Sequence, residues 1–220
     1  MKKTVRSALS AALLGVTALL TGCATKPETT LEVTWAAPQL PPAKSFNKLL
    51  IITVANSEFV QEAFQNQMAA ELKKRGVNAV ASRRYFTRYT DAERDRFMKS
   101  IADSEADHIL LARVTDTSTK TYEGGGTIIG PGGVPYADAV GVQGAYARAF
   151  YPGAIVSGGA GGVAKTATSE ASIFAAKGEK LIWSARTRTT NAHRATGEEA
   201  ATQYVPVILE ALKKDKLLRN

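Results

Sequence analysis

The sequence predicts an α/β domain with a mixed sheet and covering helices, and three observations lead to that class. A continuous β-branched run at residues 48–55 is followed at once by an amphipathic stripe with helical spacing, the pattern of a buried strand and its covering helix. A second such helix precedes a third apolar run at residues 108–114, so the core order is β-α-β-α-β. Two later runs flank a Gly-containing turn, which predicts a β-hairpin.

Local signals set the ends of the predicted helices. Ser57 can cap the first helix, and Gly76 follows its basic last turn as the expected C′ residue. Residues 77–82 then form the second predicted strand. The capping box at residues 90–93 opens the second helix, which is expected to run to about residue 105 with Phe97 facing inward.

The α/β pattern is interrupted by a glycine-rich excursion at residues 124–162, where only Asp138 and Arg148 are charged. Three interpretations of this segment stay open. It is a flexible or partly ordered loop, a β-excursion used in contacts, or a membrane hairpin. Tyr136 and Tyr146 within it are candidate contact residues.

The last third of the chain predicts a β-hairpin and a C-terminal helix. Residues 165–176 and 181–190 are the two strands around a turn at 177–179, with Trp183 as the expected core anchor. A capping box at residues 196–199 opens the final helix. Pro206 lies inside that helix, so a kink or break is expected there.

Residues 1–22 have the layout of a secretory signal peptide. Basic residues precede an apolar run at 8–20 that is too short to span a bilayer as a mature helix. Leu-Thr-Gly-Cys at residues 20–23 matches the bacterial lipobox, and Cys23 is the one cysteine of the chain. The motif predicts cleavage between Gly22 and Cys23 and lipidation of Cys23, palmitate included. Ala24, in place of Asp, favours the periplasmic face of the outer membrane.

Residues 23–45 are predicted to be a lipid anchor and proline-containing tether, and residues 46–220 the periplasmic domain. Within the tether, residues 31–35 alternate and suit an edge strand. A flexible tether of roughly twenty residues spans about 25 Å, which keeps the domain near the membrane.

Charge and aromatic residues suggest partners in the envelope. Removing Lys2, Lys3 and Arg6 from the formal charge of +8 leaves +5. For an exported, membrane-tethered chain this suits anionic lipid or peptidoglycan rather than nucleic acid. Residues 83–89 interleave cations with aromatic rings, so the cations of this stretch are a candidate contact surface: Arg83, Arg84 and Arg88.

The sequence predicts no enzyme. Cysteine pairs for structural zinc are absent, and the glycine stretch matches neither dinucleotide-binding nor phosphate-loop spacing. No catalytic residue, metal or cofactor is therefore expected. An envelope hydrolase stays an alternative, with His108 and His193 as its candidate residues.

Two segments carry a family resemblance. Ala-Asp-His-Ile-Leu-Leu-Ala-Arg at residues 106–113 and Gly-Glu-Lys-Leu-Ile-Trp-Ser-Ala at residues 178–185 resemble segments of an uncharacterised family of bacterial outer-membrane lipoproteins. The order of elements resembles TolB amino-terminal-like α/β domains. Distant relatives of that kind are the penicillin-binding-protein activator and curli-secretion lipoproteins.

This resemblance implies an envelope lipoprotein with a non-enzymatic binding, adaptor or assembly role. The expected partners are the membrane, through the lipid, and another envelope protein, peptidoglycan or anionic lipid. Self-association is left open, and an oligomeric secretion or pore subunit that uses the glycine-rich segment is the alternative.

Overall fold

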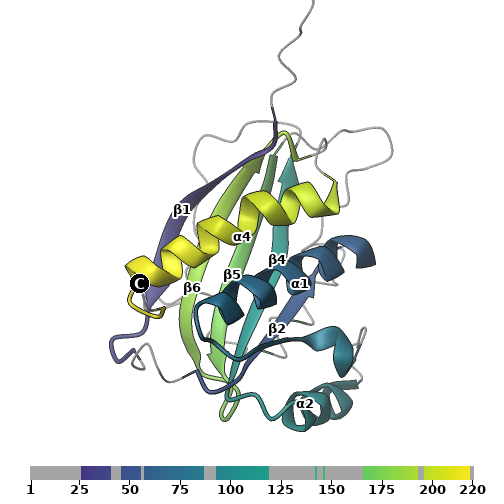
Figure 1. The fold of residues 1–220 in the computed structure, drawn as a ribbon, viewed down its shortest axis with the longest axis vertical. Helices are drawn as coiled ribbons and strands as arrows, with labels where there is room; N and C mark the ends of the chain where they lie inside the picture. The colour runs from purple at the N-terminus through teal and green to yellow at the C-terminus, as the bar shows by residue number, and fades with distance from the viewer. Residues whose placement is uncertain are drawn as a thin grey trace, which may run out of the picture.

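The computed structural model describes residues 26–40, 46–55, 57–86, 93–118, 142, 146, 166–192 and 196–218. These residues form a mixed sheet with the strand order β1-β6-β5-β4-β2-β3 (Figure 1). The strands are β1 (Glu28–Ala36), β2 (Leu49–Val54), β3 (Ala79–Ala81), β4 (His108–Ser118), β5 (Thr166–Ala175) and β6 (Leu181–Thr190). The helices are α1 (Glu58–Lys74), the 3₁₀ turn η1 (Ser82–Arg84), α2 (Arg94–Asp103) and α4 (Gly197–Lys214). The predicted α/β class with a mixed sheet is confirmed.

The sheet has a parallel and an antiparallel half. β3, β2 and β4 run parallel, and α1 and α2 are their crossovers. β4, β5, β6 and β1 are antiparallel. All six residues of β2 are buried, because helices cover both of its faces, as its unbroken apolar sequence predicts. The predicted hairpin is β5–β6, and Gly178 in its turn has a φ of +81°, a conformation that glycine adopts without strain.

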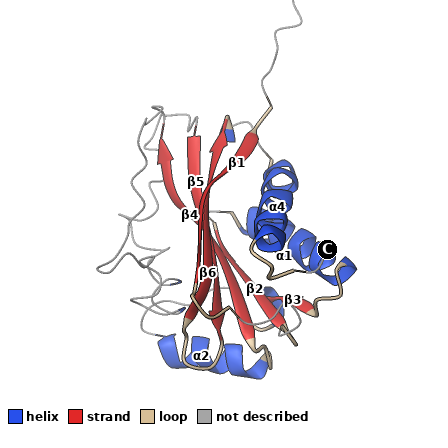
Figure 2. Ribbon diagram, turned by 90° about the vertical axis from the view of Figure 1, so that its left-hand side faces the viewer, coloured by secondary structure: helices blue, strands red, loops and turns tan. Residues whose placement is uncertain are grey.

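Helices α1 and α4 lie side by side on one face of the sheet (Figure 2). Their apolar stripes belong to the same core cluster as Trp183 of β6, which is fully buried, as expected for the core anchor. The Trp183 Nε1–H donates a hydrogen bond of 2.7 Å to Oδ2 of Asp215, just after α4. This bond satisfies the one polar atom of a buried indole. Gly197 begins α4 against α1, where a Cβ would lie 2.8 Å from the Phe59 ring.

The opposite face carries a second apolar cluster beneath α2. Phe97 of α2 stacks on Tyr146, with ring centroids 4.5 Å apart and planes 26° apart. Phe86 meets the Phe97 ring edge-on at 5.3 Å. Val142 and Tyr146 are therefore the described residues through which the glycine-rich segment joins this core. The rest of that segment, on which its three interpretations depend, lies outside the described ranges.

The predicted boundary between tether and domain, at residue 46, changes because β1 belongs to the sheet. Residues 28–36 pair with β6 along the strand, and the Ala37 N–H continues the ladder to the Ile182 carbonyl at 2.8 Å. The predicted edge strand therefore belongs to the sheet, and the folded domain starts near residue 28 rather than at residue 46. The tether that remains between Cys23 and β1 is residues 24–27.

Helix α4 runs unbroken through Pro206, so the expected break does not occur. Thr202, four residues earlier, and Pro206 are both exposed, so the carbonyl that lacks an N–H partner faces solvent. The predicted capping box is present: Thr196 Oγ1 accepts the Glu199 N–H at 3.2 Å, and the Glu199 carboxylate accepts the Thr196 N–H at 2.9 Å.

Candidate functional site

The end of the sheet nearest Cys23 gathers chain segments that are far apart in the sequence. Glu28 lies opposite Thr190, Thr190 opposite Thr166, and Thr166 opposite Ser118. The start of α4 is also here, since Lys26 is close enough to affect the Glu199 carboxylate. We call residues 26–28, 190–191 and 196–199 the anchor end, after the lipid anchor that the sequence predicts at Cys23.

The charges described at the anchor end are mostly acidic. Glu28, Glu198 and Glu199 are exposed beside Lys26. Hydrogen bonds from Thr196, together with the Lys26 charge, hold the pKa of Glu199 below its usual value. The carboxylates at the start of α4 also complement the helix dipole. The Glu199 carboxylate therefore stays charged at neutral pH.

Strand β1 leaves one edge of the sheet open. Its inner edge pairs with β6, and among the described residues no strand lies beyond it. Leu31 and Val33 are 36 % and 42 % exposed, and the register shifts between them. An open edge invites an added strand, whereas a bulge limits that pairing. The edge is chemically suited to bind an extended segment through backbone hydrogen bonds.

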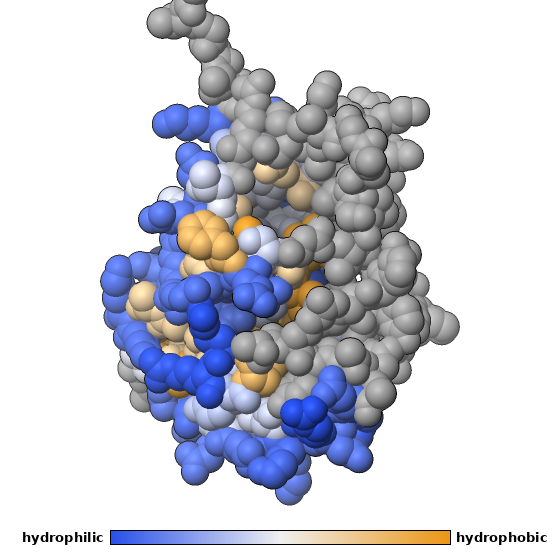
Figure 3. Space-filling model, turned by 90° about the vertical axis from the view of Figure 1, so that its right-hand side faces the viewer, coloured by the Kyte–Doolittle hydropathy of each residue, from blue (hydrophilic) through white to orange (hydrophobic). Residues whose placement is uncertain are grey.

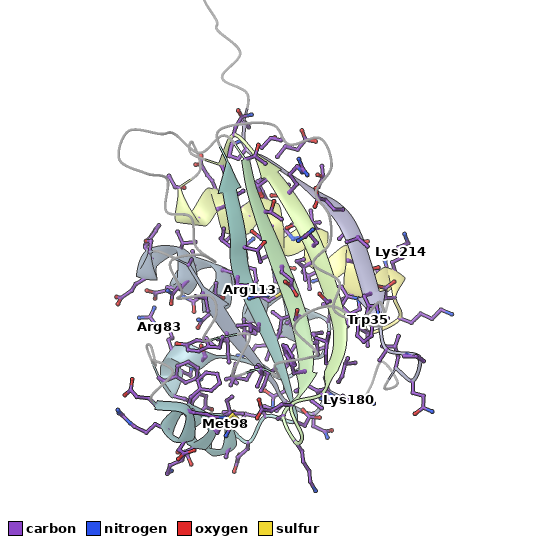
Figure 4. All side chains as sticks on the ribbon, turned by 180° about the vertical axis from the view of Figure 1, so that it is seen from behind. Trp35, Arg83, Met98, Arg113, Lys180 and Lys214 are labelled. Atoms are coloured by element: carbon purple, nitrogen blue, oxygen red, sulfur yellow. The ribbon has the colours of Figure 1, made fainter. Side chains whose placement is uncertain are left out.

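A charged row crosses the sheet on the face opposite α1 and α4. Arg113 of β4, labelled in Figure 4, contacts Glu170 of β5 at 3.0 Å. Arg186 of β6 lies opposite Glu170 in the strand register. Glu170 also accepts hydrogen bonds from Ser172 at 3.0 Å and Ser184 at 3.3 Å. The Arg113 and Glu170 side chains are only 11 % and 17 % exposed, so removing either partner would leave an uncompensated charge in a largely buried place. The sequence analysis did not predict this row, although each of the three predicted strands contains one of its charged residues.

The predicted cationic surface is only partly described. Arg83 and Arg84 are exposed in η1. Arg83 forms an ion pair with Glu62 of α1, and its backbone N–H donates to Gln65 at 3.3 Å. The hydrogen bond from Arg83 lowers the pKa of Glu62. The charge of Arg83 is thus already partnered within the chain.

Four other predicted site residues lie outside the described ranges: Gly22, Cys23, Arg88 and Tyr136.

The prediction that Tyr146 is a contact residue does not agree with its position in the structure. Its side chain is 3 % exposed and packs between Phe97 and Phe86. An aromatic ring held on two sides by other rings gains more from burial than from solvent contact. Within the isolated chain, Tyr146 is therefore a core residue.

His108 belongs to a structural clasp at the start of β4. Its ring meets Phe46 edge-on at 4.8 Å, and its Nδ1 lies 3.1 Å from Asp107 Oδ2 without the alignment of a hydrogen bond. The Asp107 carboxylate accepts the backbone N–H groups of Asn47 at 3.0 Å and Lys48 at 2.7 Å. Burial alone raises the pKa of Asp107, but these bonds and the neighbouring histidine outweigh burial and lower it.

His193, the second candidate of the hydrolase alternative, lies outside the described ranges. Within those ranges, no group of three or more His, Cys, Asp or Glu side chains is placed to hold a metal ion. None of the helices described there has the length and apolar character needed to cross a membrane.

Comparisons with known proteins give weak likenesses. No protein-family profile and no curated protein match the chain. Among solved structures, a PelC dodecamer from Paraburkholderia phytofirmans aligns at a TM-score of 0.42 and 11 % identity, over 82 % of this chain and 95 % of that one. A methionine variant of the same dodecamer aligns at 0.42 and 14 % identity, over 83 % and 98 %. Likenesses of this size do not establish a shared function.

Proposed function

We propose that this chain is a lipoprotein of the bacterial envelope, anchored through Cys23 to the periplasmic face of the outer membrane, and that it binds or assembles other envelope components without catalysis. The observation that carries the proposal is the lipobox cysteine placed five residues before a strand of the folded sheet. A chain of five residues extends at most about 18 Å. The domain is therefore held against the membrane surface.

The open β1 edge supports the binding role. Its outward backbone groups pair with no strand among the described residues, and another envelope protein can add a strand there, next to the proposed anchor. The position of His108 supports a non-catalytic role, because its ring packs on Phe46 and the adjacent Asp107 is occupied by backbone N–H groups. These contacts give both residues a structural function.

The test of the anchor compares the full chain with Cys23→Ser in a Gram-negative host. Cells are fed an alkyne fatty acid, and membranes are separated on a density gradient. The native chain should carry the fatty acid and co-sediment with outer membrane, whereas Cys23→Ser should carry none and lose the membrane. Ala24→Asp is the matched control: it should stay acylated and move toward the inner membrane. Equal labelling of native chain and Cys23→Ser would exclude lipidation at Cys23.

A second candidate function, an oligomeric assembly subunit, is favoured by the same open edge. Val33→Lys places a charge on that edge, which opposes strand addition. Light scattering of the lipidated chain in detergent should then show a uniform oligomer that Val33→Lys dissociates. A monomer for both chains would exclude this candidate and leave the binding role.

A further inference from the structure

We infer that the anchor end faces the bilayer and that the β5–β6 hairpin turn points away from it, so that the strands stand up from the membrane. The inference rests on the proposed lipid attachment at Cys23. It deepens that proposal by naming the surface that meets lipid and the surfaces left for partners.

The first step is reach. Glu28 begins β1 five residues after Cys23, so it lies within about 18 Å of the anchored cysteine at any tilt. Strand β6 runs from the hairpin to the anchor end over ten residues, which corresponds to about 30 Å. The hairpin at residues 176–180 therefore meets the bilayer only if the sheet lies flat.

The second step is that α4 gives lipid no apolar face, and that the exposed apolar residue of α1, Phe59, lies beside Gly197 at the anchor end. The apolar side chains of α4 face the sheet, and its exposed positions are polar apart from Pro206. Glu198, Glu199 and Glu210 are among them. A helix that lies on a membrane instead turns an apolar face outward, with Lys and Arg flanking it. The flank in Figure 3 is likewise mostly hydrophilic over its described part, with apolar residues in small separate areas.

The β1 edge is the competing contact, since Leu31 and Val33 are exposed there. Laying that edge on the bilayer would also bring the outward N–H and C=O groups of β1, which pair with no described strand, toward lipid. Hydrocarbon offers those groups no hydrogen-bond partner, and each unsatisfied group costs several kcal/mol. An upright domain keeps the edge in water, where a protein strand can pair with it.

The third step is charge. Helix α1 connects the parallel strands β2 and β3, so it runs against them and ends away from the anchor end. Helix α4 begins at the anchor end and also runs away from it (Figure 1). Their last turns carry exposed basic residues: Lys73, Lys74, Lys213 and Lys214. Among the described residues, the more acidic end of the domain is therefore the one that meets the membrane, and the basic helix ends face the periplasm.

The test measures the height of single sites above the bilayer. Cys23 is the one cysteine of the chain, and in the proposed anchor its sulfur is blocked by a thioether bond to the lipid, so a thiol-reactive label attaches only to the introduced cysteine. Glu28→Cys, Val33→Cys and Lys177→Cys, three exposed positions, are made in the full lipidated protein. Each carries an environment-sensitive fluorophore in phosphatidylcholine vesicles with a spin-labelled headgroup.

Quenching should be strong at position 28, several-fold weaker at position 33 and absent at position 177. Equal quenching at 28 and 33 would mean that the edge lies on the bilayer, and quenching at 177 would mean a flat sheet. Either result overturns the inference. Urea unfolding of each labelled protein should match the native chain, which excludes misfolding as the cause.

A tether variant provides the control. Twelve Gly/Ser residues inserted between Thr25 and Lys26 should reduce quenching at position 28 to the level at position 177, and unchanged quenching there would overturn the role of the short tether. Failure of the lipid anchor itself looks different. The protein would not float with vesicles, and its N-terminal peptide would lack the acyl mass.

Discussion

At the scale of single residues, Asp107 holds the start of β2 against the start of β4. Its carboxylate accepts the backbone N–H groups of Asn47 and Lys48, and Asp107→Ala would leave both without that acceptor. We expect Asp107→Ala to lower the free energy of unfolding by about 1–3 kcal/mol, measured by urea denaturation of the unlipidated chain. Asp103→Ala, which removes an exposed ion pair with Lys99, should change it by less than about 0.5 kcal/mol. Equal effects of the two substitutions would contradict the clasp.

The lowered pKa of Asp107 gives the same residue a pH signature. Because the carboxyl pKa is lower in the folded than in the unfolded chain, its contribution is full above the unfolded value of about 3.9. It is lost as the pH falls through the folded value. The difference in unfolding free energy between the native chain and Asp107→Asn should therefore be constant near neutral pH and shrink below about pH 4. A difference that does not change down to pH 2.5 would show that the carboxylate charge is not involved.

Single residues were predictable from the sequence where their role is local. Trp183, an aromatic residue within a strand of alternating pattern, is the buried anchor that the pattern indicates. Tyr146 was misassigned because alternation of small and large residues does not say which neighbours a ring meets. The Arg113–Glu170 pair depends on the register between two strands that are 57 residues apart, which neither strand encodes alone.

At the scale of elements, side-chain packing in α4 outweighs the unfavourable effect of a proline inside the helix. A proline inside a helix costs about 3 kcal/mol, whereas burying each large aliphatic side chain returns about 1.5–3 kcal/mol. Helix α4 buries four such residues on the sheet side: Val205, Ile208, Leu209 and Leu212. The summed gain exceeds the cost, so the helix continues through Pro206.

Pro206→Ala should therefore stabilise the domain. The substitution restores an N–H for the Thr202 carbonyl, and both residues are exposed, so the core is unchanged. We expect the free energy of unfolding to rise by about 1–3 kcal/mol in urea denaturation. Gln203→Ala, an exposed neighbour on the same helix, serves as the control and should be near neutral. A loss of stability in Pro206→Ala would mean that the proline ring makes a packing contact that the chain needs.

The alternation at residues 31–35 predicted strand β1, but the sequence did not reveal its partner. The strand is followed closely by Pro38, Pro41 and Pro42. Because of this proline content, the sequence analysis assigned residues 31–35 to the tether. Its pairing with β6 links residues about 150 positions apart, such as Trp35 and Ser184. Such a contact becomes visible only once the sheet is assembled, which is why the domain boundary was placed after β1.

At the scale of the whole molecule, β1 is the edge strand that covers β6 and leads from the sheet toward the proposed lipid anchor at Cys23. Ala36 packs against the core beneath α4, and Ala37 extends the ladder to β6. Thr29 and Thr189 also share a side-chain hydrogen bond of 2.8 Å, buried near the anchor end. Removing β1 would expose this part of the core and turn β6 into the open edge.

A truncation series tests whether β1 belongs to the domain. Soluble chains that start at residue 24 or residue 26 should unfold cooperatively with the same free energy. A chain that starts at residue 46 should lose at least about 3 kcal/mol and self-associate through the exposed β6 edge, as seen in urea denaturation and size-exclusion chromatography. Adding a peptide of residues 26–40 to it should restore the monomer. If the chain from residue 46 is instead as stable as the longer ones, β1 is part of a long tether, and the membrane no longer constrains how the domain is oriented.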